Sequence, residues 1–502
     1  MHGIPNLEPT CDHLFIAMVG NVGSGVTTTA ETLRDALVRD YGYAVQILRM
    51  SEFIETSHLG KERGLTNLAP EQKVDAYQTC GNDLRKRYGD DYLARRAIHA
   101  ANAHPMSQSR HAYIFDSFKH PSEIATLKRC YEERLLTFTV FCPSRVRKGR
   151  LENKGISSRT IDDIFDRDEF ELDAHGQKVR DTAYLSDFFI RNASQNTVSI
   201  EATIKRYLEI IFGTKIHSPT ADESGMAKAF GAAANSACMS RQVGASVYDR
   251  AGKLLATGCN DVPKFGGGIY GETSDLSVDN RCYNWKNKVC HNDFEKSEIY
   301  KDLVDALFPE KALGKDFSEL KDSIISRIKG TRVRDLIEFS RSVHAEMDAL
   351  VSVSRHGTGS TIGGTLFSKT FPCHNCARHI VAAGITRVIF VEPYPKSLAL
   401  KLHSDSITVK DDDSANHVFF VQYEGVSPKV FSRFFSVERS RKENGKVMQI
   451  ASDSARPIGI PISPSYKMDA TRLGMAEPEP ELPLSVKTME PPSPHSPRTP
   501  AA

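Results

Sequence analysis

The chain has 502 residues, of which 40% are hydrophobic and 25% charged; this is the composition of an ordinary globular protein with room for more than one domain. Its formal net charge of +2 gives no overall field that would favour stable binding to nucleic acid. Ten cysteines are too few for a disulfide scaffold, and no apolar run is long enough to cross a membrane.

Residues 1–12 are predicted to form an N-terminal tail without the apolar core of a signal peptide, so we expect a cytoplasmic protein. A buried strand at 14–19 follows and runs into the glycine-rich loop 20–28, which opens a helix. Strand, glycine loop and helix in this order are typical of a P-loop, whose backbone N–H groups and helix N-terminus bind phosphate.

The loop departs from the P-loop consensus at one position. Val26 stands where the consensus has a lysine that contacts the outer phosphates, whereas Thr27 keeps the hydroxyl that binds Mg²⁺. We therefore expect a bound nucleotide, with Mg²⁺ if it is a nucleoside triphosphate, but not efficient phosphoryl transfer. The alternative is a glycine-rich turn that has lost its ligand.

Alternating strands and helices predict a doubly wound parallel sheet over residues 13–215; the later elements lie at 111–116, 136–141, 187–192 and 200–212. Asp116, at a strand end, either holds Mg²⁺ through water or caps the next helix. The basic cluster 144–150 either clamps phosphates or is a solvated helix face. The region resembles nucleotide and nucleoside monophosphate kinases of the P-loop class. The residues predicted to bind nucleotide are Gly20, Asn21, Val22, Gly23, Ser24, Gly25, Val26, Thr27, Thr28 and Asp116.

A second region begins after the polar boundary 216–220. A helix rich in small residues at 226–238 precedes a hairpin with strands at 243–248 and 254–257. The hairpin leads to Asn260, whose amide either bonds a sugar hydroxyl or only satisfies a turn.

The insertion 264–330 is expected to be a lid or a binding loop near an active site, as long insertions often are. Its Cys282, Cys290 and His291 offer an alternative, as part of a second metal site. No fourth ligand is visible for that site, and the spacing is unlike that of a standard zinc finger.

Two short motifs beyond the insertion combine into one metal site. A helical pattern at 342–355 carries His344 and Glu346 near its start, and Cys373 and Cys376 follow after a short strand. H-x-E followed by P-C-x-x-C is the signature of zinc-dependent nucleobase deaminases. We predict that the histidine and the two cysteines bind Zn²⁺, that a fourth position stays open for water, and that Glu346 carries protons. A structural zinc site, the alternative, usually closes its fourth position with another Cys or His.

The order of these elements predicts an α/β/α sandwich for a domain at 219–440. From about residue 219 to 402 the chain resembles the cytidine and deoxycytidylate deaminase superfamily, most closely the deoxycytidylate deaminase branch. The matching segments are 241–245, 258–260, 344–346, 372–376 and 392–397. The resemblance implies that Asn260 contacts the deoxyribose and that Tyr394 lies near the bound nucleotide.

A P-loop region paired with such a domain, over most of residues 13–440, resembles the bacterial antiviral deoxycytidine nucleotide deaminases, which deplete these nucleotides during phage infection. The resemblance implies conversion of dCTP, dCMP or both to dUTP or dUMP and ammonia. Gating by a regulatory nucleoside triphosphate at the P-loop and a homo-oligomer are further expectations. A polynucleotide-editing deaminase is the alternative, but no aromatic and basic stripe for a single strand is visible. The Pro-rich segment 451–502 is predicted to be disordered.

Overall fold

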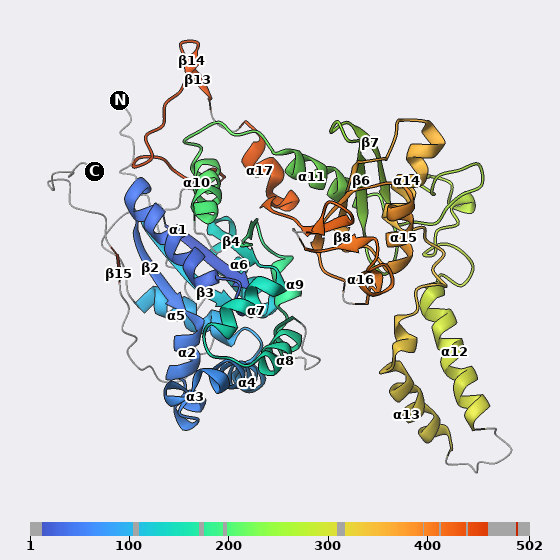
Figure 1. The fold of residues 1–502 in the computed structure, drawn as a ribbon, viewed down its shortest axis with the longest axis horizontal. Helices are drawn as coiled ribbons and strands as arrows, with labels where there is room; N and C mark the ends of the chain where they lie inside the picture. The colour runs from blue at the N-terminus through green and yellow to red at the C-terminus, as the bar shows by residue number, and fades with distance from the viewer. Residues whose placement is uncertain are drawn as a thin grey trace, which may run out of the picture. The chain divides into compact units, whose positions relative to one another are not determined.

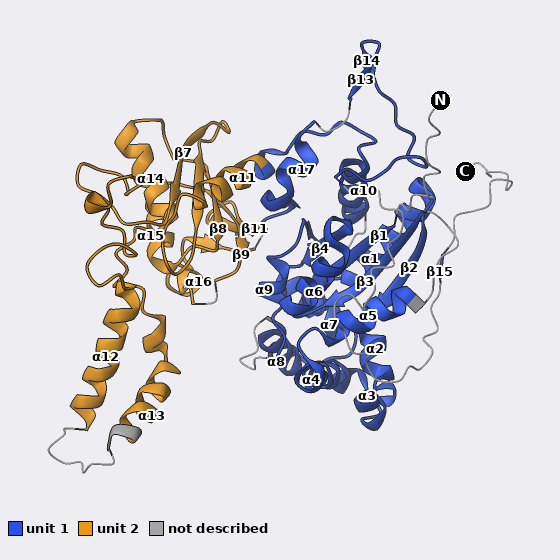
Figure 2. Ribbon diagram, turned by 180° about the vertical axis from the view of Figure 1, so that it is seen from behind, with its two compact units in different colours: residues 1–223, 423–502 blue, residues 224–422 orange. Residues whose placement is uncertain are grey.

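The computed structural model describes residues 13–103, 110–169, 175–193, 198–308, 317–394, 396–410, 413–437, 440–459 and 488–489. They form two compact units, one from residues 1–223 and 423–502 and the other from residues 224–422 (Figure 2). The predicted N-terminal tail, and the predicted disordered segment from residue 460 onward except 488–489, lie outside the described residues.

The first unit is built on a seven-stranded sheet with the order β12-β5-β4-β1-β3-β2-β15 (Figure 1). The inner strands are parallel, and the short edge strands β12 and β15 pair antiparallel. All of β1 is buried in the middle of the sheet, which is why its sequence is continuously apolar. The strands are β1 (Leu14–Gly20), β2 (Ala44–Arg49), β3 (His111–Phe118), β4 (Leu135–Phe141), β5 (Phe188–Arg191), β12 (Gly425–Val426) and β15 (Thr488–Met489); β13 (Lys442–Glu443) and β14 (Lys446–Val447) form a separate hairpin.

Helices cover both faces of this sheet, as predicted for a doubly wound fold. Leu14 and Ile16 of β1 share a core with α1 and α10. Phe15 points to the other face, where it stacks on Tyr131 of α6 with ring centroids 3.6 Å apart. The helices are α1 (Val26–Tyr41), α2 (Met50–Thr56), α3 (His58–Glu62), α4 (Pro70–Tyr88), α5 (Tyr92–Ala103), α6 (Pro121–Tyr131), α7 (Ser144–Glu152), α8 (Ser158–Glu169), α9 (Val179–Ala183), α10 (Val198–Phe212) and α17 (Phe431–Phe435).

The chain returns to the first unit after residue 422, whereas the sequence predicted that the second region continues to residue 440. β12 extends the first sheet by pairing Val426 with Phe188 of β5. Phe434 of α17 then packs on Phe188, with ring centroids 5.2 Å apart. The described part of 423–440 therefore belongs to the core of the first unit.

The beginning of the segment predicted to be disordered is also part of this unit. Ala455 is buried, and its carbonyl accepts a hydrogen bond from Arg110 Nη2 at 2.7 Å. Ile458 donates its backbone N–H to the carbonyl of Ile211 in α10 at 2.7 Å. The prediction of disorder is thus wrong for residues 451–459, because these long-range bonds leave no local pattern in the sequence.

The second unit contains a six-stranded sheet with the order β10-β11-β9-β8-β6-β7. β6 and β7 form the predicted hairpin, and β8, β9, β11 and β10 are parallel. The strands are β6 (Gly244–Tyr248), β7 (Leu254–Cys259), β8 (Thr365–Thr370), β9 (Arg387–Glu392), β10 (Ile407–Thr408) and β11 (Val418–Gln422). The helices are α11 (Ala221–Ala233), α12 (His291–Leu307), α13 (Phe317–Lys329), α14 (Ala345–His356), α15 (His374–Ala382) and α16 (Ala399–Leu402).

Two glycines let helices lie close to opposite faces of this second sheet. A Cβ on Gly244 of β6 would clash with the backbone of α11 at Ala233. A Cβ on Gly258 of β7 would clash with the backbone of α14, including the carbonyl of Ala345. Because β6 and β7 pair antiparallel with Gly244 opposite Cys259, these glycines face opposite sides. The unit is therefore the predicted α/β/α sandwich, with α12 and α13 of the insertion packed against each other.

No helix in the described part of the chain is both long enough and apolar enough to span a membrane.

Candidate active site

The site in the second unit forms where two helices begin. His344 directly precedes α14, and Cys373 directly precedes α15, so both residues lie at helix N-termini. Cys376 follows one turn into α15, and its backbone N–H donates to Cys373 Sγ at 3.4 Å. A helix N-terminus stabilises a thiolate, which is the form that binds a metal ion.

The predicted zinc ligands converge on one point. Nδ1 of His344 lies 3.3 Å from Cys373 Sγ and 3.4 Å from Cys376 Sγ, and the three ligand atoms lie within 4.8 Å of one another. One imidazole and two thiolates at this spacing suit a tetrahedral Zn²⁺ that keeps its fourth position for water. The donor set therefore fits the predicted cofactor.

The protonation of this ligand set is tied to its geometry. The hydrogen bond from Cys376, together with that from His344, lowers the pKa of the Cys373 thiol to about 4. The hydrogen bond with Cys373 raises the pKa of His344 to about 9. One sulfur is therefore a thiolate at neutral pH, while the protons on His344 and Cys376 are those that a bound metal ion would displace.

Glu346 lies in the first turn of α14, beside the ligand set. Its carboxylate is 4% exposed and accepts hydrogen bonds from Ser368 Oγ at 3.4 Å and from Cys376 Sγ at 3.6 Å. Burial raises the pKa of Glu346 above its ordinary value. A carboxyl group with a raised pKa next to the open ligand position is suited to take and return a proton.

The two predicted substrate-binding residues line one cavity of about 220 Å³ together with His344, Glu346 and Cys373. Tyr394 is half-buried there. Asn260 already uses its amide on the backbone: Oδ1 accepts from the N–H of Val243 at 2.7 Å, and Nδ2 donates to the carbonyl of Arg241 at 2.7 Å. Asn260 therefore does hydrogen-bond the nearby backbone, as the alternative proposed, and its amide keeps one N–H that could bond a ligand.

The sequence did not single out the arginines of this cavity. Arg241 and Arg341 both line it, and the guanidinium of Arg341 lies 3.6 Å from the ring centroid of Trp285. A signal was available for both, because Arg241 begins the matching segment 241–245 and Arg341 lies three residues before His344. Two cations beside a zinc ligand set provide charge for an anionic group of a substrate.

The insertion reaches the cavity, as predicted for a lid or binding loop, because Cys282, Cys290 and His291 line it. Within the described ranges, however, the only three residues whose ligand atoms gather for a metal ion are the histidine and the cysteines of the first set. The alternative of a second metal site is therefore not supported. The sequence spacing could not exclude it because the separation of the three side chains depends on the fold of the insertion.

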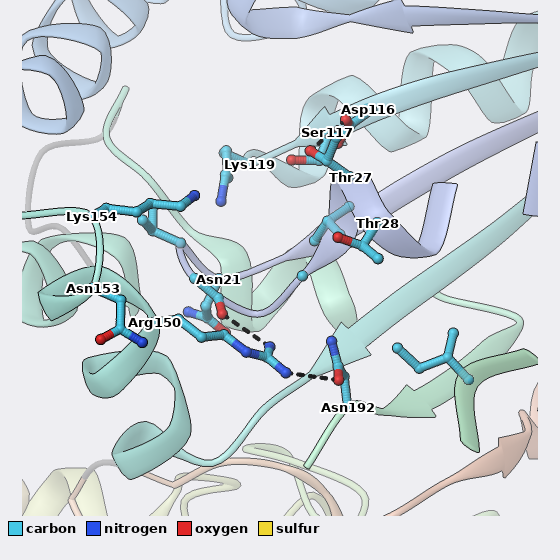
Figure 3. Close-up of a pocket in the computed structure, with 15 residues that line it drawn as sticks. Asn21, Thr27, Thr28, Asp116, Ser117, Lys119, Arg150, Asn153, Lys154 and Asn192 are labelled. Atoms are coloured by element: carbon cyan, nitrogen blue, oxygen red, sulfur yellow. Dashed lines mark hydrogen bonds between the residues drawn. The ribbon is translucent and has the colours of Figure 1, made fainter. Parts of the chain in front are cut away.

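The predicted P-loop lies in the first unit beside a second cavity, of about 600 Å³ (Figure 3). Gly25, with a φ of +85°, caps α1. The hydroxyl of Thr27 donates to Asp116 Oδ2 at 2.8 Å, so these predicted residues meet, and burial raises the pKa of Asp116. The helix-cap alternative for Asp116 is wrong, because His120 caps α6.

Most of the residues predicted to bind nucleotide line this cavity, and Gly20 and Ser24 do not. Several further residues of the lining were missed by the sequence, among them Lys119, Lys154 and Asn192. These three come from connections that follow β3, α7 and β5, and only the fold brings these connections to the loop. In the basic cluster, Arg150 lines the cavity, so the cluster is not simply a solvated helix face.

Comparisons with known proteins match part of the chain. Residues 219–392 match the model of the cytidine and deoxycytidylate deaminase zinc-binding region. Deoxycytidylate deaminase of Enterobacteria phage T2 is 34% identical over 55 residues, which are 11% of this chain and 29% of that protein. ComE operon protein 2 of Bacillus subtilis (strain 168) is 36% identical over 55 residues, with the same coverage of 11% and 29%. The chain thus spans less than a third of the length of these relatives.

Among solved structures, dCMP deaminase from the cyanophage S-TIM5 in apo form is 17% identical with a TM-score of 0.23, covering 41% of this chain and 100% of that one. Shikimate kinase from Acinetobacter baumannii is 14% identical with a TM-score of 0.22, covering 42% and 97%. The match to the family model includes the whole predicted ligand set, His344, Cys373 and Cys376.

Proposed function

We propose that the second unit is a zinc-dependent deaminase that converts dCMP, dCTP or both to the corresponding deoxyuridine nucleotide and ammonia. The observation that carries the proposal is a buried carboxylate, Glu346, beside a histidine and two cysteines with the spacing of a three-ligand zinc site. A structural zinc site would need neither an open fourth position nor a neighbouring buried acid.

When bound, Zn²⁺ would polarise a water molecule and so make a nucleophile available at neutral pH. Glu346 would take one proton from the attacking water and give it to the ring nitrogen of cytosine, where it stays in the product. It would then carry the second proton of the water to the exocyclic amine, which leaves as ammonia when the carbon–nitrogen bond breaks and the new carbon–oxygen bond remains. Burial raises the pKa of Glu346, which lets the carboxyl group hold each proton between its uptake and its release. Ser368, which donates to the carboxylate at 3.4 Å, orients it.

The cations of the cavity favour a nucleotide over an uncharged nucleoside. Arg241 and Arg341 supply two positive charges within reach of a phosphate. The similarity to the deoxycytidylate deaminases of phages T2 and T4 agrees with a deoxycytidine nucleotide as substrate. The pairing with a P-loop-like unit supports a further proposal, that the reaction depletes deoxycytidine nucleotides and so defends a bacterial cell against phage.

The test is ammonia release from dCMP, dCTP, CMP, cytidine and a cytosine-containing single-stranded DNA, with zinc content measured on the same sample. We expect activity on the deoxycytidine nucleotides and a loss of roughly 100- to 10,000-fold in Glu346→Gln, with the zinc content unchanged. Lys253→Ala, at an exposed position of the β6–β7 turn, is the control. Equal activity of Glu346→Gln and the wild type would refute the mechanism, and activity on DNA alone would favour the polynucleotide-editing alternative.

A further inference from the structure

We infer that the cavity of the first unit binds the polyphosphate of a nucleoside triphosphate, and that Lys119 supplies the ammonium group that Val26 cannot. Val26 occupies the lysine position of the loop, and its side chain is buried against the hydrophobic core. If the loop still binds phosphate, a positive charge must come from another element.

The first observation is the orientation of the loop. The carbonyl of Val22 accepts from Arg147 Nε at 2.9 Å. The carbonyl of Ser24 accepts from Arg150 Nη1 at 3.1 Å and from Asn192 Nδ2 at 2.8 Å. In a trans peptide the N–H points opposite to the carbonyl, so the N–H groups of the residues that follow, at positions 23 and 25, are turned to the other side of the loop.

These groups are left for a ligand. Neither the N–H of Gly23 nor that of Gly25 has a hydrogen-bond partner among the described residues. Gly23 and Gly25 are half-buried, and free backbone N–H groups in a concave glycine loop are groups that bind an anion.

The second observation is the position of Lys119. It directly follows β3, the strand next to β1, and its Nζ lies 2.5 Å from the carbonyl oxygen of Gly20, the first residue of the loop. Nζ also donates to Asp168 Oδ1 at 3.3 Å, which accounts for two of the three N–H groups of the ammonium. Figure 3 shows Lys119 and Lys154 both pointing into the space beside the loop.

Asp168 positions Lys119. This carboxylate is completely buried; Oδ2 accepts the N–H of Val22 at 2.6 Å and pairs with Arg147 Nη2 at 3.5 Å. Asp168 thus holds the Lys119 ammonium group, the glycine loop and α7 together. A charge held by a buried partner loses less side-chain entropy when a ligand arrives.

The balance of charge and size identifies the class of ligand. Lys119, Arg150 and Lys154 line the cavity, against one lining carboxylate, Asp116. The cations come from different elements, so they can contact an elongated anion at several points. A volume of about 600 Å³ is that of a site for a molecule of nucleotide size rather than for a single phosphate.

The experiment is calorimetric titration of the full-length protein with ATP, dCTP, inorganic tripolyphosphate and cytidine, with and without MgCl₂. We expect the wild type to bind at least one triphosphate more tightly than tripolyphosphate, and not to bind cytidine in this cavity. Lys119→Met should weaken binding roughly 10- to 100-fold, the value of a lost charge-assisted hydrogen bond. Lys148→Met is the control, because this lysine of α7 is paired with Asp162 outside the cavity.

A merely structural role of Lys119 makes a different prediction. The double variant Lys119→Met with Val26→Lys returns an ammonium group to the loop and should recover the affinity to within a few fold. If Lys119 only stabilised the loop through its hydrogen bond to the carbonyl of Gly20, the double variant would not recover the affinity, because Val26→Lys does not replace that bond. If Lys119→Met does not fold, Lys154→Met tests the same cavity at a lysine that does not bond the carbonyl of Gly20, and it should weaken triphosphate binding several-fold. Unchanged affinity in a folded Lys119→Met protein, or no binding of any triphosphate by the wild type, would overturn the inference.

Discussion

The contact between Gly258 and α14 gives a sharp test of how the sheet positions the catalytic helix. A Cβ at this position would lie 2.6 Å from the carbonyl oxygen of Ala345, where ordinary contact begins at 3.4 Å. Because the opposing atoms are backbone, α14 must move outward by at least about 0.8 Å to admit the methyl group of Gly258→Ala, and further to clear the backbone nitrogen of Ala349, which is the nearest atom. The helix carries Glu346 and follows His344, so the movement separates both from the cysteines of α15.

We expect Gly258→Ala to lose deaminase activity by roughly 100-fold, the cost of a misplacement near 1 Å, and to lose about 1–3 kcal/mol of stability from overpacking. Steady-state kinetics, zinc content and thermal unfolding measure these effects. Gly231→Ala in α11 is the matched control, because a Cβ there meets no atom within 4 Å. Wild-type kcat/KM and full zinc content in Gly258→Ala would refute the reasoning.

Other predictions concern the metal, a buried ion pair and pH. Dialysis against a chelator should abolish deamination, Zn²⁺ should restore it, and Cys373→Ser should lower the zinc stoichiometry; activity that survives with no metal detected would contradict the ligand assignment. Arg85 Nε and Glu123 Oε1 are 2.9 Å apart and fully buried, so Arg85→Met should cost about 3–5 kcal/mol. Arg85→Met with Glu123→Gln, which removes the unpaired charge but keeps an oxygen for the backbone N–H groups of Lys119 and His120, should recover much of it in denaturant unfolding. Burial lowers the pKa of His111 to about 4 and that of the neighbouring His13 to about 3; the unfolded chain therefore takes up these protons first, and each histidine should lower stability by about 1.4 kcal/mol per pH unit from pH 6.5 towards 4. His111→Phe should remove about half of that slope, and an unchanged slope would exclude His111 as one of its origins.

The zinc motif could be located from sequence because its geometry is local. His344 and Glu346 share one helix start, and a spacing of three brings Cys373 and Cys376 to one face of another. The strand β1 could be predicted for the same reason, since a strand buried on both faces is apolar at every position. Such patterns depend on neighbours a few residues away.

The parts that sequence reasoning missed depend on distant neighbours. Lys119 reaches the loop only because β3 pairs with β1 in one register, and no pattern around Lys119 indicates that pairing. The sugar contact of Asn260 stays a prediction, but the hydrogen bonds of its amide with the backbone at Arg241 and Val243 could not be read from the local sequence. The sequence did not indicate that residues 423–437 belong to the first unit, because a strand as short as β12 shows no recognisable alternation of apolar and polar residues.

The pairing of β12 with β5 makes the first unit discontinuous in sequence, and this affects its synthesis. The edge of β5 stays unpaired until residues 425–426 have been synthesised. These residues follow Arg191 by more than 230 positions, which takes roughly 10 to 50 s at common elongation rates. During that interval an unpaired strand edge is open to other chains, while the whole of the second unit emerges and can fold. A fragment that stops near residue 215 would keep this edge exposed permanently. The two units are therefore coupled on the ribosome, because the first can be completed only after the second has been made.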